Sequence, residues 1–212
     1  MSTITGKMAN QFNKSIKKHQ KGRIELILGP MFSGKSSELF RRVLRHSIAQ
    51  RSCILAKYQK DQRQLEETFK TAQIQTTKTN EYLNIMPISK LSDLNEQNVS
   101  ETKVIGIDEG QFYPDLFDMC SELVLKDKIV IISALDGDFE RKPFGQIPQL
   151  IPMCDEIIKL NAICQRCGDE APFTHRLVTS KEVELVGWKD VYEPLCRHCY
   201  DSAIGLRKKN GI

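Results

Sequence analysis

The chain lacks the long apolar segments typical of membrane proteins and secreted precursors. No run of about 18 apolar residues, the length that a membrane-spanning helix needs, occurs in its 212 residues. The first twenty residues are polar and contain several lysines, without the apolar core of a signal peptide. We therefore expect a soluble, cytoplasmic protein with no membrane partner.

Internal repeats and low-complexity blocks are also lacking, which excludes repeat arrays and fibrous proteins. Hydrophobic residues make up 40% of the chain and charged residues 27%, close to the proportions of ordinary globular proteins. A length of 212 residues suits one α/β domain with room for one small accessory module.

A strong net charge is missing as well. The formal charge is +4, and the basic excess lies mainly near the two ends of the chain, in residues 14–23 and 207–209. Such ends are more often solvated tails than nucleic-acid contacts. We therefore expect no nucleic-acid partner.

Short apolar stretches alternate with amphipathic ones along the first two thirds of the chain. The predicted strands are 24–28, 52–58, 103–107 and 128–135, and the predicted helices are 36–50 and 115–125. This alternation implies a parallel sheet with helices on both faces, an α/β fold. Residues 59–100 receive no assignment, and residues 111–114 and 136–148 are predicted loops.

A phosphate-binding motif lies between the first predicted strand and the first predicted helix. Residues 29–36, GPMFSGKS, fit G-x-x-x-x-G-K-[ST]. Glycines let backbone N–H groups converge on phosphate oxygens, Lys35 would reach the β- and γ-phosphates of ATP, and the Ser36 hydroxyl would bind Mg²⁺. An ordinary glycine turn with an exposed lysine is the alternative. The residues expected to bind ATP phosphates are Gly29, Met31, Phe32, Ser33, Gly34, Lys35, Ser36 and Ser37.

Two adjacent carboxylates, Asp108 and Glu109, follow the predicted strand 103–107. In a parallel sheet this end of the strand faces the same crevice as the phosphate loop. Because successive strand residues point to opposite sides, we assign Asp108 to Mg²⁺ and Glu109 to general-base catalysis. The proton that Glu109 accepts would come from water in an ATPase or from a substrate hydroxyl in a kinase, and the phosphate loop alone does not decide between them.

Four of the seven cysteines form two C-x-x-C pairs, Cys164 with Cys167 and Cys196 with Cys199. This is the spacing of a four-cysteine zinc site, and an inserted hairpin would account for the 28 residues between the pairs. A redox dithiol is the main alternative. Four thiolates leave no open coordination position, so we expect the zinc to be structural.

These patterns divide the chain into four parts. We predict a flexible extension in residues 1–22, a P-loop NTPase-like nucleotide-binding domain in 23–160, a small zinc-stapled module in 161–200 and a tail in 201–212.

Taken together, the motifs resemble the thymidine kinase family of the cytosolic type. Along the chain they are the phosphate loop, Asp61-x-Arg63, Asp108-Glu109-Gly110-Gln111-Phe112, Leu135-Asp136-Gly137-Asp138-Phe139, Lys142-Pro143-Phe144-Gly145 and the cysteine pairs, ending in Cys196-Arg197-x-Cys199-Tyr200. The resemblance covers about residues 23–200. It implies transfer of the γ-phosphate of ATP to the 5′-hydroxyl of thymidine, or of deoxyuridine, with Mg²⁺, in pyrimidine deoxynucleotide salvage.

The resemblance also implies roles for individual residues. Glu109 would be the base, with Asp61, Arg63 and Gln111 supporting the active site, and the module 161–200 would close over the nucleoside as a lasso. The implied nucleoside contacts are Met31, Phe112, Leu135, Phe139, Phe144, Thr174, Val183 and Tyr192. Such a set is chemically reasonable, because thymine is a flat methylated ring that aromatic and methionine side chains bury well.

Family members are typically homotetramers inhibited by dTTP, and the resemblance implies the same here. A nucleic-acid-dependent ATPase or a zinc-ribbon binding protein is the alternative function, favoured only by the basic ends.

Overall fold

The computed structural model describes residues 21–60, 82–180, 182, 185 and 189–209. Its centre is a sheet of six strands, namely β1 (Arg23–Leu28), β2 (Cys53–Tyr58), β3 (Leu83–Ile88), β4 (Val104–Ile107), β5 (Ile129–Ala134) and β6 (Glu156–Lys159). The strand order is β3-β2-β4-β5-β1-β6, and every pairing is parallel. The predicted parallel sheet is confirmed.

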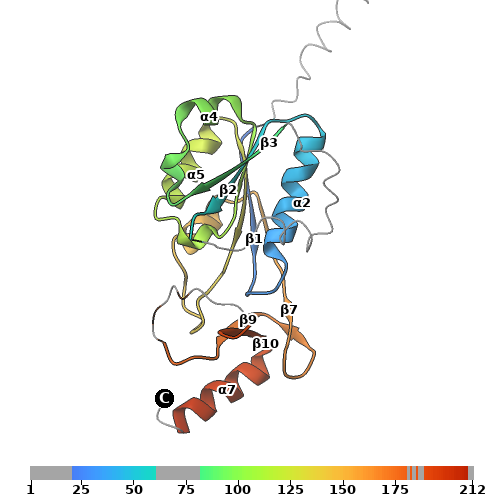
Figure 1. Ribbon diagram of the computed structural model, residues 1–212, viewed down its shortest axis with the longest axis vertical. Helices are drawn as coiled ribbons and strands as arrows, with labels where there is room; N and C mark the ends of the chain where they lie inside the picture. The colour runs from blue at the N-terminus through green and yellow to red at the C-terminus, as the bar shows by residue number, and fades with distance from the viewer. Residues whose placement is uncertain (1–20, 61–81, 181, 183–184, 186–188, 210–212) are drawn as a thin grey trace, which may run out of the picture.

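Helices cover both faces of this sheet (Figure 1). Helix α2 (Lys35–Ile48) packs Leu39, Phe40 and Val43 on one face, in a cluster with residues of β1, β2, β4 and β5. Helix α5 (Leu116–Leu125) packs on the other face, on the same side as α4 (Glu96–Glu101). All six residues of β2 and of β5 are buried, as expected for strands enclosed between two helical layers.

The remaining elements are short, apart from the last helix. Those of the main domain are the 3₁₀ turns η1 (Leu91–Asp93), η2 (Gly110–Phe112) and η3 (Ile151–Met153) and the single-turn helix α6 (Ile147–Leu150). Those that follow are β7 (Ala162–Ile163), β8 (Glu170–Ala171), β9 (Phe173–Arg176), β10 (Tyr192–Leu195) and α7 (Arg197–Lys209). Strands β9 and β10 form an antiparallel pair, which supplies the hairpin expected between the cysteine pairs.

Two strands of the sheet, β3 and β6, were not predicted from the sequence. Both lie at edges of the sheet, where one side of the backbone is unpaired and polar side chains are tolerated. Strand β3 contains Asn84 and Pro87, and β6 begins with Glu156 and ends with Lys159, so neither has the apolar pattern of a buried strand. Helix α7 continues through residues 201–209, which the sequence analysis assigned to a tail.

The described residues of the segment 161–200, the lasso module, lie beyond the end of the sheet that carries the phosphate loop (Figure 1). A hydrogen bond joins the two parts directly, since the backbone N–H of Met31 donates to Thr174 Oγ1 of β9 at 2.9 Å. Within the described part of the chain, no helix is long and apolar enough to cross a membrane.

Candidate active site

The phosphate loop between β1 and α2 depends on two glycines. Gly29 has φ 149°, and a Cβ there would lie 2.5 Å from the Leu160 carbonyl oxygen. Gly34 has φ 83° and caps α2 in the left-handed conformation, which glycine adopts at little cost. The buried Lys35 donates from Nζ to the Pro30 carbonyl oxygen at 2.7 Å. The Lys35 ammonium is therefore held against the loop by a carbonyl that a phosphate oxygen can replace.

Asp108 lies at the carboxyl end of β4 and is joined to the phosphate loop. Its Oδ1 accepts hydrogen bonds from Ser36 Oγ at 2.8 Å and from Ser133 Oγ of β5 at 2.6 Å. The Asp108 side chain is only 2% exposed, so its carboxylate is fixed in place by two hydroxyl groups. Ser36 and Asp108 thus present oxygen ligands side by side, the donor chemistry that Mg²⁺ prefers.

Glu109 has a different environment from its neighbour. It adopts φ 56° and ψ 45°, a left-handed conformation that is uncommon for residues other than glycine and is concentrated at functional sites. Gln111 Nε2 donates to Glu109 Oε2 at 2.7 Å, and Gln111 Oε1 accepts from the backbone N–H of Leu135 at 2.9 Å. Strand alternation does not explain the different environments of the two acids, because β4 ends at Ile107 and the chain turns at Glu109.

Part of the predicted nucleoside pocket forms an aromatic group beside Glu109. Phe112 stacks on Tyr58 with ring centroids 4.9 Å apart and meets Phe144 edge to face at 5.5 Å. Gly145, at φ 56°, allows this approach, because a Cβ there would lie 2.3 Å from the Gln111 carbonyl oxygen. Loop 136–146 is thus packed against the turn that carries Glu109.

Three other predicted nucleoside residues, Thr174, Tyr192 and Phe139, lie in or against the lasso module. Thr174 holds the backbone of Met31, as described above, and Tyr192 is buried in β10 with its hydroxyl donating to the Leu185 carbonyl oxygen at 2.9 Å. Phe139 is tied to the end of the module, since its carbonyl oxygen accepts from Tyr200 Oη at 2.5 Å.

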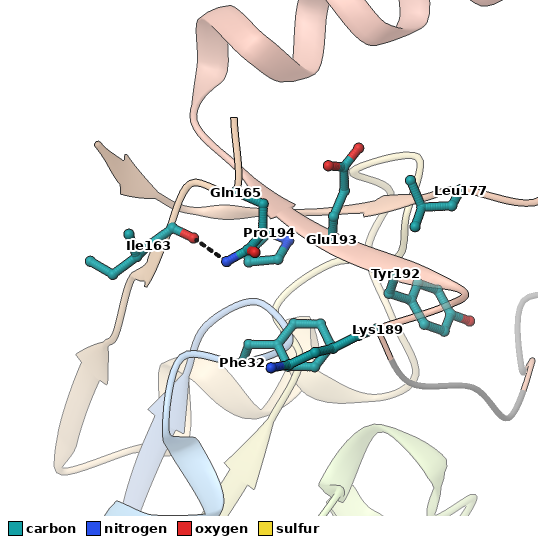
Figure 2. A pocket seen from close by; sticks show the side chains of 8 residues that line it. All are labelled: Phe32, Ile163, Gln165, Leu177, Lys189, Tyr192, Glu193 and Pro194. Carbon is teal, nitrogen blue, oxygen red and sulfur yellow. Dashed lines mark hydrogen bonds between the residues drawn. The ribbon is translucent and has the colours of Figure 1, made fainter. Parts of the chain in front are cut away.

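One cavity of about 340 Å³ lies between the phosphate loop and β10 (Figure 2). Its lining residues are Phe32, Ile163, Gln165, Leu177, Lys189, Tyr192, Glu193 and Pro194. Only Phe32 and Tyr192 of these were predicted site residues, so this cavity does not coincide with the predicted nucleoside pocket. Of the predicted phosphate-loop residues, Ser33 donates from Oγ to the Pro30 carbonyl oxygen at 2.9 Å, and Ser37 lies in the first turn of α2. Three further predicted site residues, Asp61, Arg63 and Val183, lie outside the described residues.

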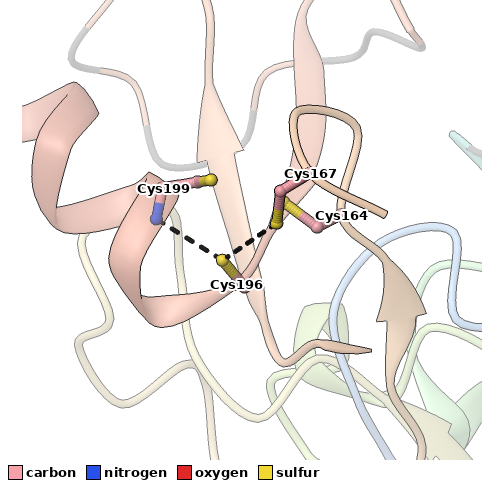
Figure 3. A group of neighbouring side chains, drawn as sticks. All are labelled: Cys164, Cys167, Cys196 and Cys199. Carbon is pink, nitrogen blue, oxygen red and sulfur yellow. Dashed lines mark hydrogen bonds between the residues drawn. The ribbon is translucent and has the colours of Figure 1, made fainter. Parts of the chain in front are cut away.

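The four paired cysteines come together in space (Figure 3). Their Sγ atoms all lie within 4.8 Å of one another, and the Sγ atoms of Cys167 and Cys196 are 3.6 Å apart. Four sulfurs bound tetrahedrally at about 2.3 Å from zinc would be about 3.8 Å apart, so this cluster has dimensions that fit the ion. Burial by itself raises the pKa of Cys164, but backbone hydrogen bonds from Cys196, Arg166 and Cys167 outweigh it and lower the pKa to about 6. A low pKa favours the thiolate, the form that binds zinc. In the metal-free cluster this holds for Cys164 and not for its neighbours: the pKa of Cys167, although a backbone hydrogen bond from Asp169 lowers it, is raised overall by hydrogen bonds with the other thiols, and burial raises the pKa of Cys199 to about 12.

Each cysteine pair lies where two short elements meet. Cys164 and Cys167 occupy the loop between β7 and β8, whereas Cys196 follows β10 and Cys199 lies in the first turn of α7. The cluster therefore fixes both ends of the β9–β10 hairpin. The neighbouring His175 is not part of the cluster, because its Nδ1 lies 3.0 Å from Glu193 Oε1.

Three residues that the sequence analysis did not single out shape the site. Ser133 orients Asp108, Tyr58 supports the ring of Phe112, and Arg176 contacts Tyr192 and Phe139. Ser133 and Tyr58 occupy strand ends next to the predicted residues, so the alignment of parallel strands is the signal that could have identified them. Nothing in the local sequence identifies Arg176.

Comparison with known proteins was made with the sequence and with the fold. The sequence model of a family described as thymidine kinase matches residues 22–200. The thymidine kinase of monkeypox virus is 45% identical over 179 residues, covering 84% of this chain and 97% of the viral protein. The cytosolic thymidine kinase of Homo sapiens is 46% identical over 180 residues, covering 85% of this chain and 74% of the human protein.

A solved structure with a similar fold is the flagellar accessory protein FlaH from Methanocaldococcus jannaschii. It aligns with a TM-score of 0.53 and 15% sequence identity, covering 74% of this chain and 80% of FlaH. At this identity the likeness concerns the fold alone.

Proposed function

This chain belongs to the thymidine kinase family, and from that premise we propose how its residues carry out the reaction of an ATP-dependent thymidine kinase. The enzyme transfers the γ-phosphate of ATP to the 5′-hydroxyl of thymidine and yields dTMP and ADP. One observation supports this assignment of roles. Asp108 accepts a hydrogen bond from Ser36 of the phosphate loop, and the next residue, Glu109, is oriented by a hydrogen bond from Gln111.

The phosphate loop binds the triphosphate of ATP. Lys35 exchanges the Pro30 carbonyl for β- and γ-phosphate oxygens, and the loop N–H groups at the start of α2 add donors and the positive end of the helix dipole. Ser36 and Asp108 would hold the Mg²⁺ that accompanies ATP. When bound, the ion would supply charge neutralisation at the transferring phosphoryl group.

Glu109 accepts the proton of the thymidine 5′-hydroxyl as that oxygen attacks the γ-phosphorus. Gln111 donates to one carboxylate oxygen of Glu109 and so orients the carboxylate for this step. The group beside Glu109 decides the reaction. If water lies there, ATP is hydrolysed; if the 5′-hydroxyl of a bound nucleoside lies there and water is excluded, the phosphoryl group is transferred to the nucleoside.

The thymine ring would lie between the aromatic group at Phe112 and the lasso module. Phe112 and Phe144 offer apolar surface on one side, and Thr174 and Tyr192 lie on the other. The zinc-bound cysteines have no part in the chemistry in this proposal. They hold the ends of the hairpin that carries Thr174 and Tyr192, and so preserve the shape of the pocket.

We further infer from the family resemblance that the enzyme is a cytosolic homotetramer, that dTTP inhibits it from the acceptor site and that deoxyuridine is a second substrate. Strand β6 forms an edge of the sheet with Ile157 41% exposed, which makes this edge a reasonable place for contact between subunits. Sedimentation of the purified protein and inhibition by dTTP in competition with thymidine test these inferences.

The experiment that tests the function is ADP release with different acceptors. We expect ADP release to require thymidine and to be unaffected by DNA or RNA. Stimulation by DNA or RNA in the absence of thymidine would support the alternative of a nucleic-acid-dependent ATPase instead.

A further inference from the structure

Arg176 is a charged side chain buried completely inside the lasso module. It lies in β9 directly opposite Tyr192 of β10 and has 0% of its surface exposed. Burying a guanidinium group is costly unless its N–H donors and its charge are satisfied. A buried cation in this position therefore indicates a role that a smaller apolar residue could not fill.

The contacts of Arg176 converge on the predicted nucleoside pocket. Its Nη2 donates to Tyr192 Oη at 2.7 Å, and its guanidinium carbon lies 3.7 Å from the centroid of the Phe139 ring and 5.1 Å from that of Tyr192. Both aromatic residues belong to the set expected to surround the nucleoside. Arg176 thus joins loop 136–146 of the main domain to β10 of the lasso module.

The same guanidinium also holds the backbone between β9 and β10. Its Nη1 donates to the carbonyl oxygens of Ser180, at 3.1 Å, and of Glu182. The Tyr192 hydroxyl, which receives its hydrogen bond from Arg176, donates in turn to the Leu185 carbonyl oxygen. Arg176 and its partner Tyr192 therefore fix the backbone carbonyls of Ser180, Glu182 and Leu185.

We propose that Arg176 is a positioning residue for the nucleoside: through its fork of N–H groups and its stack on Phe139, it sets the places of Tyr192, Phe139 and the backbone carbonyls of Ser180 and Glu182 around the base. This inference rests on the proposed function. A planar guanidinium can stack on a ring while donating in two directions in its own plane, whereas the ammonium of lysine is a point charge without that fork. Arginine is therefore required at this position, and lysine is a poor replacement.

The test compares Arg176→Met and Arg176→Lys with the wild-type enzyme. We expect both substitutions to raise KM for thymidine by about ten- to a hundredfold, the loss typical of hydrogen bonds made by a charged donor. KM for ATP should change by less than about twofold, because the contacts of Arg176 described above are with the lasso module and Phe139, and zinc content should stay at the wild-type level. The matched control is Arg45→Met, which removes an exposed guanidinium in the last turn of α2 and should leave both KM values unchanged.

Three results would overturn the proposal. KM for thymidine could stay at the wild-type value, it could rise in parallel with KM for ATP and with a lower melting temperature, or Arg176→Lys could restore the wild-type value. If Arg176→Met does not fold, Tyr192→Phe removes only the hydroxyl that Arg176 holds, and an unchanged KM for thymidine in that variant would overturn the proposal too. Absence of thymidine kinase activity in the wild-type enzyme would instead refute the proposed function.

Discussion

The proposed site has two sides: the phosphate side is built on the parallel sheet, whereas the nucleoside side depends largely on the lasso module. On the phosphate side, Ser36, Asp108 and Ser133 come from neighbouring strand ends and a helix start, and direct hydrogen bonds join them. On the nucleoside side, two-residue and four-residue strands are held by four cysteines and one buried arginine. Removal of single interactions should therefore reduce turnover on the first side and substrate affinity on the second.

The largest effect is expected on the phosphate side, for Glu109→Gln. Glutamine preserves size and the hydrogen bond with Gln111 but removes the base, so kcat should fall by about 10²- to 10⁴-fold while both substrates still bind. Steady-state kinetics at saturating thymidine and ATP measure this. Glu140→Gln, which changes an exposed carboxylate in loop 136–146, is the control. Near-normal kcat in Glu109→Gln would show that Glu109 is not the base.

Asp108→Asn should separate magnesium binding from base catalysis on the same side. Asparagine keeps an oxygen near Ser36 but loses the charge, so the apparent affinity for Mg²⁺ should fall by about ten- to a hundredfold. A magnesium titration of activity should then show partial recovery at high Mg²⁺, in contrast to Glu109→Gln. The exposed Asp118→Asn serves as control. Identical titration curves for the variants at 108 and 109 would contradict the separate roles.

On the nucleoside side, Cys167→Ser tests whether zinc maintains the pocket. The wild-type protein should contain about one zinc per chain, and loss of one thiolate should lower zinc content, melting temperature and thymidine affinity together, with KM for thymidine rising about tenfold. Metal analysis, thermal melting and kinetics on one preparation provide the measurements. Cys154→Ser, which changes a half-buried cysteine outside the cluster, should retain zinc. Active wild-type protein without zinc would refute this part of the account.

The smallest effect is expected for Phe112→Ala, which removes one ring from the aromatic group. KM for thymidine should rise about three- to tenfold while KM for ATP stays constant, because in the proposed pocket the ring faces the base and not the phosphates. Phe117→Ala, on α5 and packed against the core, controls for general loss of packing. Equal changes in both KM values for Phe112→Ala would indicate a defect in folding.

The same contrast between the two sides governs what the sequence alone could predict. The phosphate loop, Asp108 and Glu109 follow strands whose apolar pattern is plain, because β1, β4 and β5 are covered by helices on both faces. The edge strands β3 and β6 are exposed on one side and have no such pattern. Spacing also predicts the cysteine cluster, since the C-x-x-C pairs are local in the sequence.

The contacts that shape the nucleoside side are less accessible to sequence analysis. Arg176 contacts Phe139, which is 37 residues away in the sequence. No local sequence pattern predicts an arginine buried between two rings. Thr174 was expected from the family resemblance to contact the nucleoside, and the structure adds that it holds the backbone N–H of Met31. Such links depend on how the lasso module packs on the sheet, which only the folded structure specifies.

The fate of the γ-phosphate tests the central claim most directly. Wild-type enzyme should be incubated with Mg²⁺ and ATP labelled in the γ-phosphate, with thymidine in one sample and 5′-deoxythymidine, which lacks the acceptor hydroxyl, in the other. The account predicts that label appears in dTMP in the first sample, and that in the second 5′-deoxythymidine receives none. Release of the label as inorganic phosphate at the same rate in both samples would show that Glu109 serves water and not thymidine, and would contradict the account.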